Sequence, residues 1–206
     1  MRNPLTEQQI LDFRQRLCET AEELFSVHGV AGVSMRQISQ QLGVSQMTPY
    51  KYFSNKEEIL AAVRASAFRR FNERLERART GVDARADARA VGQAYLDFAE
   101  QEAEAYHLMF DTYQPHASAY PEFALALHQA RACMTSYVQA LIDEGHLSGD
   151  AEELGEMFWA AAHGLVMLHG KGFTEPRKSV RKLHEQLMRY LWKGVLSDSR
   201  SSNANH

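Results

Sequence analysis

Apolar residues recur every three or four positions along nearly the whole sequence. This spacing places them on one side of an α-helix, which has 3.6 residues per turn. Within residues 55–78, the repeat consists of Leu60, Val63, Ala67, Phe68, Phe71 and Leu75. No run of alternating β-branched residues predicts a strand. The sequence therefore predicts an all-α protein.

Interruptions in this repeat divide the chain into about nine predicted helices. The first covers residues 7–28 and ends at Gly29. Its predicted inner stripe is Ile10, Phe13, Leu17, Ala21, Leu24 and Phe25. Two capping-box patterns, from Ser34 to Gln37 and from Ser54 to Glu57, predict the starts of two more helices.

Ser45 can cap a very short helix between these two. Five further helices are expected at residues 88–102, 104–113, 121–144, 150–169 and 176–195.

The helical repeat lapses near residues 80–87, where small and charged residues dominate. We place a boundary between two parts of the molecule there. The predicted organisation is an N-terminal three-helix part at 1–54, a long connecting helix at 55–80, a helical bundle at 81–196 and a disordered tail at 197–206.

The bulk properties indicate a globular protein of the cytoplasm. The chain has 206 residues, of which 45% are hydrophobic, and a net charge of -3. It begins without the pattern of a secretory signal, and no stretch reaches the roughly 18 apolar residues of a membrane span. Cys18 and Cys133 are the two cysteines, and we interpret both as buried hydrophobic residues. A redox-sensing thiol is the alternative.

Residues 43–53, GVSQMTPYKYF, carry a turn and several aromatic residues. Two short helices joined at residues 43–45 form a candidate helix-turn-helix, the second helix being expected over residues 46–53. On such a helix, Pro49 and Phe53 share an arc that can face inward. The opposite arc faces outward and consists of Gln46, Met47, Tyr50 and Lys51.

The charges near this motif favour nucleic-acid binding. Residues 34–56 carry Arg36, Lys51 and Lys56 but no acidic residue, within an acidic protein. Arg36 could read a guanine, and Lys51, Tyr52 and Lys56 could bind phosphates. The predicted DNA-binding residues are Ser34, Arg36, Ser45, Gln46, Met47, Thr48, Tyr50, Lys51, Tyr52 and Lys56. A structural helical hairpin without a DNA function is the alternative.

The same stretch resembles the DNA-binding region of TetR-type transcriptional regulators, whose pattern is roughly G-V-S-x-x-T-L-Y-x-Y-F-x-x-K-E. The resemblance covers about residues 7–65 and departs from the pattern at Met47 and Pro49. The matching residues are Gly43, Val44, Ser45, Thr48, Tyr50, Tyr52, Phe53, Lys56 and Glu57. The resemblance implies a homodimer that places paired recognition helices in successive major grooves of a near-palindromic operator. It also implies a C-terminal domain for a small-molecule effector.

The last two predicted helices indicate where a dimer could form. Residues 157–168 are apolar nearly all round, so this helix needs a second buried surface besides its own core. The last helix offers Val180, Leu183, Leu187, Leu191 and Val195 as an inner stripe, leaving Met188, Tyr190 and Trp192 for the same interface. Trp159, His163 and Gly164 also resemble the W-x-x-x-H-G signature of one TetR C-terminal type.

Rings, thioethers and a few polar groups are also available for a pocket that binds a small, mainly apolar effector. The predicted lining is Tyr106, His107, Phe110, Tyr113, Met134, Tyr137, Trp159, His163 and Met167. A well-packed core is the alternative, and residue by residue it is the commoner outcome. We therefore predict a ligand-responsive transcriptional regulator, most simply a repressor.

The sequence gives little support for an enzyme or a metal protein. Residues 104–107 form the only Glu-x-x-His, whereas a di-iron bundle needs two such motifs. Nucleotide-binding and hydrolase motifs are also missing. We predict no cofactor, metal or catalytic residue. The alternative is an all-helical enzyme or metal-binding bundle that uses His107 and His163.

Overall fold

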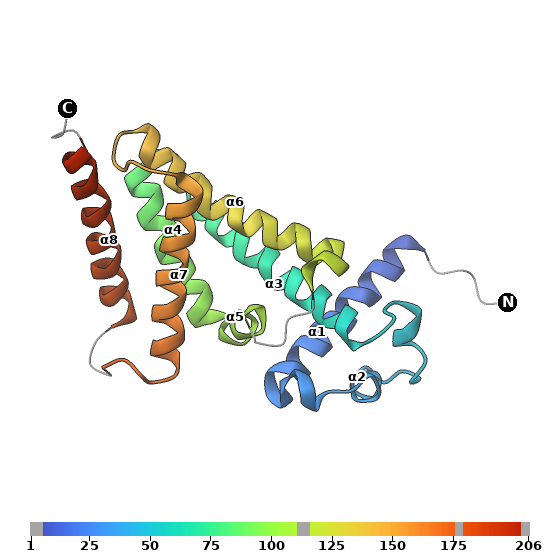
Figure 1. Ribbon diagram of the computed structural model, residues 1–206. Coiled ribbons are helices and arrows are strands. Elements are labelled where there is room, and N and C mark those ends of the chain that lie inside the picture. The colour runs from blue at the N-terminus through green and yellow to red at the C-terminus, as the bar shows by residue number, and fades with distance from the viewer. Residues whose placement is uncertain (1–5, 111–115, 176–178, 203–206) are drawn as a thin grey trace. The chain divides into compact units, whose positions relative to one another are not determined.

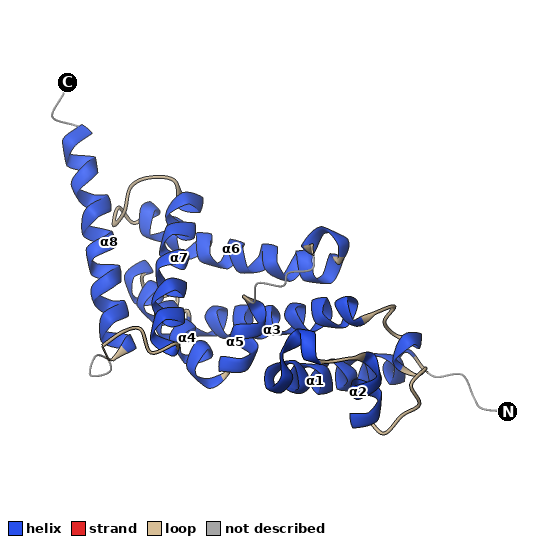
Figure 2. Ribbon diagram, turned by 60° about the horizontal axis from the view of Figure 1, so that its bottom comes forward, coloured by secondary structure: helices blue, strands red, loops and turns tan. Residues whose placement is uncertain are grey.

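The computed structural model describes residues 6–110, 116–175 and 179–202. Within these residues, eight α-helices and two short 3₁₀ helices form the fold and no strand occurs, so the all-α prediction is confirmed (Figures 1 and 2). The α-helices are α1 (Glu7–Gly32), α2 (Met35–Gln41), α3 (Lys56–Ala78), α4 (Ala84–Gln101), α5 (Ala103–Met109), α6 (Pro121–Asp143), α7 (Ala151–Gly170) and α8 (Val180–Ser202). The 3₁₀ helices are η1 (Pro49–Lys51) and η2 (Ala117–Ala119).

The described residues separate into two compact units. The first lies within Met1–Arg70 and Glu102–Leu127, and the second within Phe71–Gln101 and His128–His206. Both α3 and α6 therefore contribute residues to each unit. The boundary in the first half of the chain falls inside α3, earlier than the lapse of the helical repeat near residues 80–87.

The first unit is built around the apolar faces of α1, α2 and α3. Leu17, Phe25 and Ile38 are buried in one cluster with the N-terminal half of α3, and the predicted α3 stripe is buried throughout. Arg70 on α3 donates to Glu22 on α1 at 2.6 Å and to Glu102 before α5 at 2.8 Å. This ion-pair network connects three segments that lie far apart in the sequence.

Helix α1 differs from its prediction at both ends. Ile10, expected on the inner stripe, is exposed, because the buried face of α1 begins only at Leu17. Gly29 has a φ of 69°, so the helix breaks there as predicted, but helical geometry resumes up to Gly32. A positive φ costs glycine little, which lets the chain turn without ending the element.

The start of α3 and the end of α8 also differ from their predictions. The α3 cap is Asn55, whose side-chain oxygen accepts from the Glu58 amide at 2.8 Å, while the Ser54 amide donates to the Glu58 carboxylate. The predicted cap at Ser54 is therefore replaced by a cap at Asn55. Helix α8 continues through Ser202, so residues 197–202 are helical where the sequence predicted a disordered tail. Extending an existing helix costs far less than nucleating one. Residues 203–206 lie outside the described range.

The second unit packs α4, α6, α7 and α8 against the C-terminal part of α3. The Phe71 ring contacts Tyr95 and Phe98 edge-on, with centroid distances of 5.4 and 5.3 Å. Asp87 accepts from the Thr80 amide and hydroxyl and from the Gly81 amide, and these hydrogen bonds fix the turn before α4. In Figure 1, α7 and α8 run side by side in opposite directions.

Both cysteines are buried, as the sequence predicted. Burial raises the pKa of the Cys18 thiol and of the Cys133 thiol to about 12. Reactivity requires the thiolate, so thiols with such pKa values are inert near neutral pH. This favours the structural interpretation of both residues over a redox sensor.

Close packing of α6 on α7 gives a test of the second unit. A Cβ added to Gly155 would lie 3.2 Å from the Met134 carbonyl oxygen, so Gly155→Ala must push the two helices apart. We expect it to lower the free energy of unfolding by about 1–3 kcal/mol, measured by urea denaturation. Gly170 on the same helix has nothing within 4 Å of an added Cβ. Gly170→Ala is therefore the control, and equal stability of the two variants would contradict the packing argument.

Candidate nucleic-acid interface and ligand pocket

Helix α2 is fixed at both ends by hydrogen bonds. Ser34 and Gln37 form the predicted capping box, in which the Gln37 amide donates to the Ser34 hydroxyl and the Gln37 side chain accepts from the Ser34 amide at 2.9 Å. At the other end, Gly43 has a φ of 66° and donates to the Gln40 carbonyl. The left-handed conformation at Gly43 turns the chain sharply after α2.

The segment after this turn forms a 3₁₀ helix, η1, where the sequence predicted an α-helix over residues 46–53. Pro49 has no amide proton to donate to the Ser45 carbonyl, so the Thr48 amide donates there instead, at 2.9 Å. The next bonds also span three residues, with Lys51 donating to Thr48 and Tyr52 to Pro49. The proline therefore explains both the tighter helix and its shortness.

The predicted division between inner and outer residues of this segment is confirmed. Pro49 and Phe53 are buried in the first unit. Met47 is 67% exposed and Tyr50 is 47% exposed. The other members of the predicted outward arc, Gln46 and Lys51, are exposed as well. The other predicted DNA-binding residues differ in solvent exposure. Ser34, Arg36 and Ser45 are exposed, whereas Thr48 and Tyr52 are half-buried.

Contacts from α1 hold η1 in place, and these contacts were not predicted from the sequence. The Arg14 guanidinium donates to the Tyr52 carbonyl at 2.6 Å and lies 4.2 Å from the centroid of the Phe53 ring. The Phe13 ring packs on the Tyr52 ring at 4.6 Å. Tyr52 was predicted to bind phosphate, but its ring instead helps to anchor the segment. Nothing local in residues 43–53 indicates a partner that lies 38 residues earlier.

Lys56 has an internal role that conflicts with the predicted phosphate contact. Its ammonium donates to the carbonyls of Val30 and Val33, both at 2.8 Å. These carbonyls lie where α1 ends, and carbonyls at a helix end need outside donors. Lys56 therefore connects the start of α3 to the end of α1, and we leave it out of the interface. No sequence pattern indicates this role, because the partner carbonyls belong to the backbone.

The exposed residues that remain form the candidate interface surface, which we define as Ser34, Arg36, Ser45, Gln46, Met47, Tyr50 and Lys51. Its two charged members are both cations, and no acidic residue occurs between positions 34 and 56. Cations and hydroxyls suit phosphate oxygens, while amide, guanidinium and apolar groups suit base edges. The surface thus carries the chemistry of a DNA-reading face.

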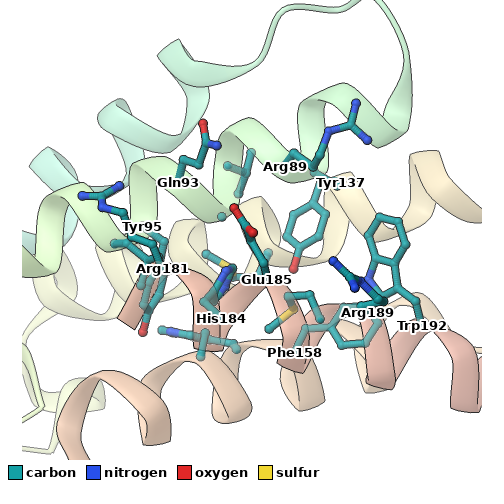
Figure 3. A pocket seen from close by; sticks show the side chains of 18 residues that line it. Arg89, Gln93, Tyr95, Tyr137, Phe158, Arg181, His184, Glu185, Arg189 and Trp192 are labelled. Atoms are coloured by element: carbon teal, nitrogen blue, oxygen red, sulfur yellow. The ribbon is translucent and has the colours of Figure 1, made fainter. Parts of the chain in front are cut away.

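A separate pocket of about 510 Å³ lies within the second unit. It is lined by eighteen residues from four helices, and Figure 3 shows their side chains converging on one space. From α4 and α6 these are Ala88, Arg89, Val91, Gly92, Gln93, Tyr95, Leu96, Met134 and Tyr137; from α7 and α8 they are Phe158, Trp159, Ala162, Arg181, His184, Glu185, Met188, Arg189 and Trp192. Its size falls in the usual range for small-molecule sites.

The pocket includes only part of the predicted lining. Met134, Tyr137 and Trp159 line it, but His163 and Met167 do not. Tyr106, His107 and Phe110 belong to the first unit, where Tyr106 is buried and its ring packs on Phe110 at 5.0 Å. Tyr113 lies outside the described residues. The prediction therefore mixed core residues of one unit with pocket residues of the other.

The missed residues come mainly from α4 and α8. Met188 and Trp192, which the sequence assigned to a dimer interface, line the pocket together with His184. Of the predicted inner stripe, Val180 is buried, and Leu183, Leu187 and Leu191 are half-buried, as Met188 and Trp192 are. Helix α8 is apolar on two faces, and periodicity alone does not tell which one turns inward.

Other site types find no support in the described parts of the chain. Among those residues, no three histidine, cysteine, aspartate or glutamate side chains gather as a metal site would require. None of the described helices combines the length and apolarity that a membrane span needs.

The fold and the exposed turn surface define a helical DNA-binding protein of the helix-turn-helix class. Residues 17–63 match the sequence profile described as "Bacterial regulatory proteins, tetR family", and residues 88–191 match "Tetracyclin repressor-like, C-terminal domain". The chain belongs to the TetR family. It is therefore a DNA-binding transcriptional regulator and not an enzyme, and the predicted family resemblance is confirmed.

Individual relatives agree with this placement. The "HTH-type transcriptional activator FasR" of Mycolicibacterium smegmatis is 32% identical over 99 residues, which cover 48% of this chain and 45% of FasR. An HTH-type transcriptional regulator of Staphylococcus aureus, SAB2452, is 37% identical over 49 residues, 24% of this chain and 26% of that protein. The chain thus spans less than half the length of these curated relatives.

Solved structures match over most of the chain. A protein of unknown function from Rhodococcus sp. RHA1 superposes with a TM-score of 0.78 at 27% identity, covering 94% of this chain and 99% of that one. SmeT, the repressor of the Stenotrophomonas maltophilia multidrug efflux pump SmeDEF, gives a TM-score of 0.65 at 22% identity, with coverages of 88% and 89%. At that identity, the likeness to SmeT concerns the fold.

The internal role of Lys56 gives a test. Lys56→Met keeps the aliphatic stem but removes the ammonium donor from both carbonyls, leaving Val30 with only the Val33 amide at 3.5 Å. We therefore expect the free energy of unfolding to fall by about 1–3 kcal/mol. Urea denaturation measures this change. We expect the salt dependence of DNA binding to stay that of the unmodified protein.

Lys51→Met is the matched control, because Lys51 is exposed. We expect it to leave stability nearly unchanged. A Lys56 variant of normal stability whose DNA binding loses salt dependence would restore the phosphate role.

Proposed function

We propose that this protein is a cytoplasmic, homodimeric repressor that leaves a near-palindromic operator when a small, mainly apolar effector binds. One observation carries the DNA-binding part of this proposal. Gln46, Met47, Tyr50 and Lys51 project into solvent from a turn whose other side is anchored by Pro49 and Phe53. Large apolar side chains such as Met47 and Tyr50 are exposed at a cost, which a binding role accounts for.

We assign separate tasks to the residues of the candidate interface surface. Arg36, on the exposed face of α2, is suited to bidentate hydrogen bonding with a guanine. Gln46 and Tyr50 can contact base edges, and Met47 can contact a thymine methyl. Lys51 and the hydroxyls of Ser34 and Ser45 are suited to backbone phosphates. The reading head in this proposal lies within residues 1–54.

The homodimer is proposed to form through α7 and α8. Met157 and Leu168 on α7 are 55% and 51% exposed, and Tyr190 on α8 is 69% exposed. Apolar residues exposed along two neighbouring helices suit a self-complementary two-fold contact, and four helices would then form a bundle. The two heads would contact half-sites about 34–36 Å apart, or a multiple of that distance.

The effector is proposed to bind in the pocket of the second unit and to change the spacing of the two heads. Helices α3 and α6 contain residues of both units, so a displacement of either helix in one unit affects the other. An effector releases DNA only to the extent that it prefers the non-binding arrangement. FasR is named an activator and SmeT a repressor, so the direction of regulation needs its own test.

Selection of bound duplexes from a random pool, followed by transcription in vitro from a promoter carrying the selected site, tests the proposal. We expect a near-palindromic site and reduced transcript on adding the protein. Increased transcript would overturn the repressor assignment alone. Failure to enrich any sequence, even at low ionic strength, would overturn the function.

The assigned tasks predict different effects for Arg36→Ala and Lys51→Ala. We expect Arg36→Ala to weaken operator binding by about 1–3 kcal/mol and to relax the preference at one base pair in each half-site. Lys51→Ala should weaken operator and random DNA alike and reduce the salt slope by about one for each head. Fluorescence anisotropy at several salt concentrations measures both effects. Identical behaviour of the two variants on both duplexes would show that the assignment is wrong.

A further inference from the structure

The pocket of the second unit carries more charge than a site for a purely apolar molecule needs. Arg89, Arg181 and Arg189 line it together with one acid, Glu185. Arg181 is already neutralised, because its guanidinium donates to Asp97 at 2.7 Å and to Glu100 at 2.5 Å. Within the described residues, Arg89 and Arg189 therefore remain without a carboxylate paired to them as Asp97 is paired to Arg181.

The register of α4 against α8 brings these two arginines to the same end of the pocket. Arg181 pairs with Asp97, and a Cβ added to Gly92 would lie 2.8 Å from the His184 ring. The α8 residue number therefore rises as the α4 number falls. Arg189 and Arg89 lie eight residues beyond the Arg181–Asp97 pair along their respective helices, so they reach the same level of the pocket. Figure 3 shows both on the side of the pocket where Trp192 lies.

Both arginines are exposed, and within the described residues neither takes part in an ion pair. Glu185 lies one helical turn before Arg189, but the two side chains form no salt bridge there. Two exposed cations at the same end of a pocket favour an anionic group there. A guanidinium pair also matches a carboxylate in geometry, since each can donate two parallel hydrogen bonds.

The rest of the pocket provides an apolar chamber next to this cationic end. Its apolar wall is formed by side chains from all four helices, namely Leu96, Met134, Phe158, Met188 and Trp192. A molecule that satisfied both parts would carry one anionic group on an apolar body. Glu185, one turn before Arg189, disfavours an anionic group close to it, so removing its charge should favour the anion.

We propose that the pocket binds an amphipathic organic anion whose carboxylate lies between Arg89 and Arg189 and whose apolar body packs against Phe158, Met188 and Trp192. This inference rests on the proposed function, because it names the chemical class of the effector.

Calorimetric titration of the full chain with three matched probes tests the proposal. Octanoate, octan-1-ol and octylammonium share one apolar body and differ in the charge of the head group. We expect octanoate to bind at least about ten-fold more tightly than the other two, as charge-assisted hydrogen bonds require. Equal binding of the three, tighter binding of octylammonium, or no octanoate binding would overturn the proposal.

Substitutions of the two arginines test where the carboxylate head group binds. Arg89→Gln and Arg189→Gln should each weaken octanoate binding about ten-fold and leave octan-1-ol binding unchanged. Arg85→Gln is the control, since Arg85 is exposed one turn earlier on α4 and does not line the pocket. Glu185→Gln should strengthen octanoate binding. Losses equal to that of the Arg85 variant would overturn the assignment to Arg89 and Arg189.

Operator affinity is measured separately for the protein with octanoate and for the protein with octan-1-ol. Tight octanoate binding that leaves operator affinity unchanged would support the ligand class but count against the proposed release mechanism. Operator release by octan-1-ol, with no preference for octanoate, would support the mechanism and overturn the ligand class.

Discussion

The anchoring of residues 49–53 on α1 determines what the rest of the candidate interface can present. Pro49 and Phe53 are buried, and Arg14 contacts both the Tyr52 carbonyl and the Phe53 ring. With that side fixed, a 3₁₀ turn leaves Tyr50 and Lys51 no place except solvent. A rigid scaffold that presents a short exposed segment is how proteins commonly build a reading surface.

Sequence patterns predicted an element well where its residues have one dominant local constraint. Apolar spacing identified the buried stripe of α3, and the capping box identified the start of α2. The errors arose where a local signal had a distant competitor. Lys56 looked like a surface cation, yet it donates hydrogen bonds to two carbonyls at the end of α1. Tyr52 looked like a phosphate ligand, yet its ring packs on Phe13.

The pocket was harder to predict for a different physical reason. Its lining comes from four helices, and the residues that meet depend on how α4 and α8 align, which no local pattern encodes. Helix α8 has apolar residues on two faces. Its leucines suggested the inner face, whereas His184, Met188 and Trp192 line the pocket, and Gly92 leaves room for the His184 ring. The face of α8 that lines the pocket thus packs closely on α4 at Gly92.

This choice of face links the two proposals about the second unit. Helix α8 presents Arg189 to the pocket and Tyr190, the next residue, to solvent on the proposed dimer face. An anion that draws Arg189 toward Arg89 acts on the same rigid helix that would contact the partner subunit. Since packed helices shift as units rather than bending freely, an effector could alter the dimer geometry without touching the DNA-binding residues. The size of that response would depend on how differently the anion binds the two dimer arrangements.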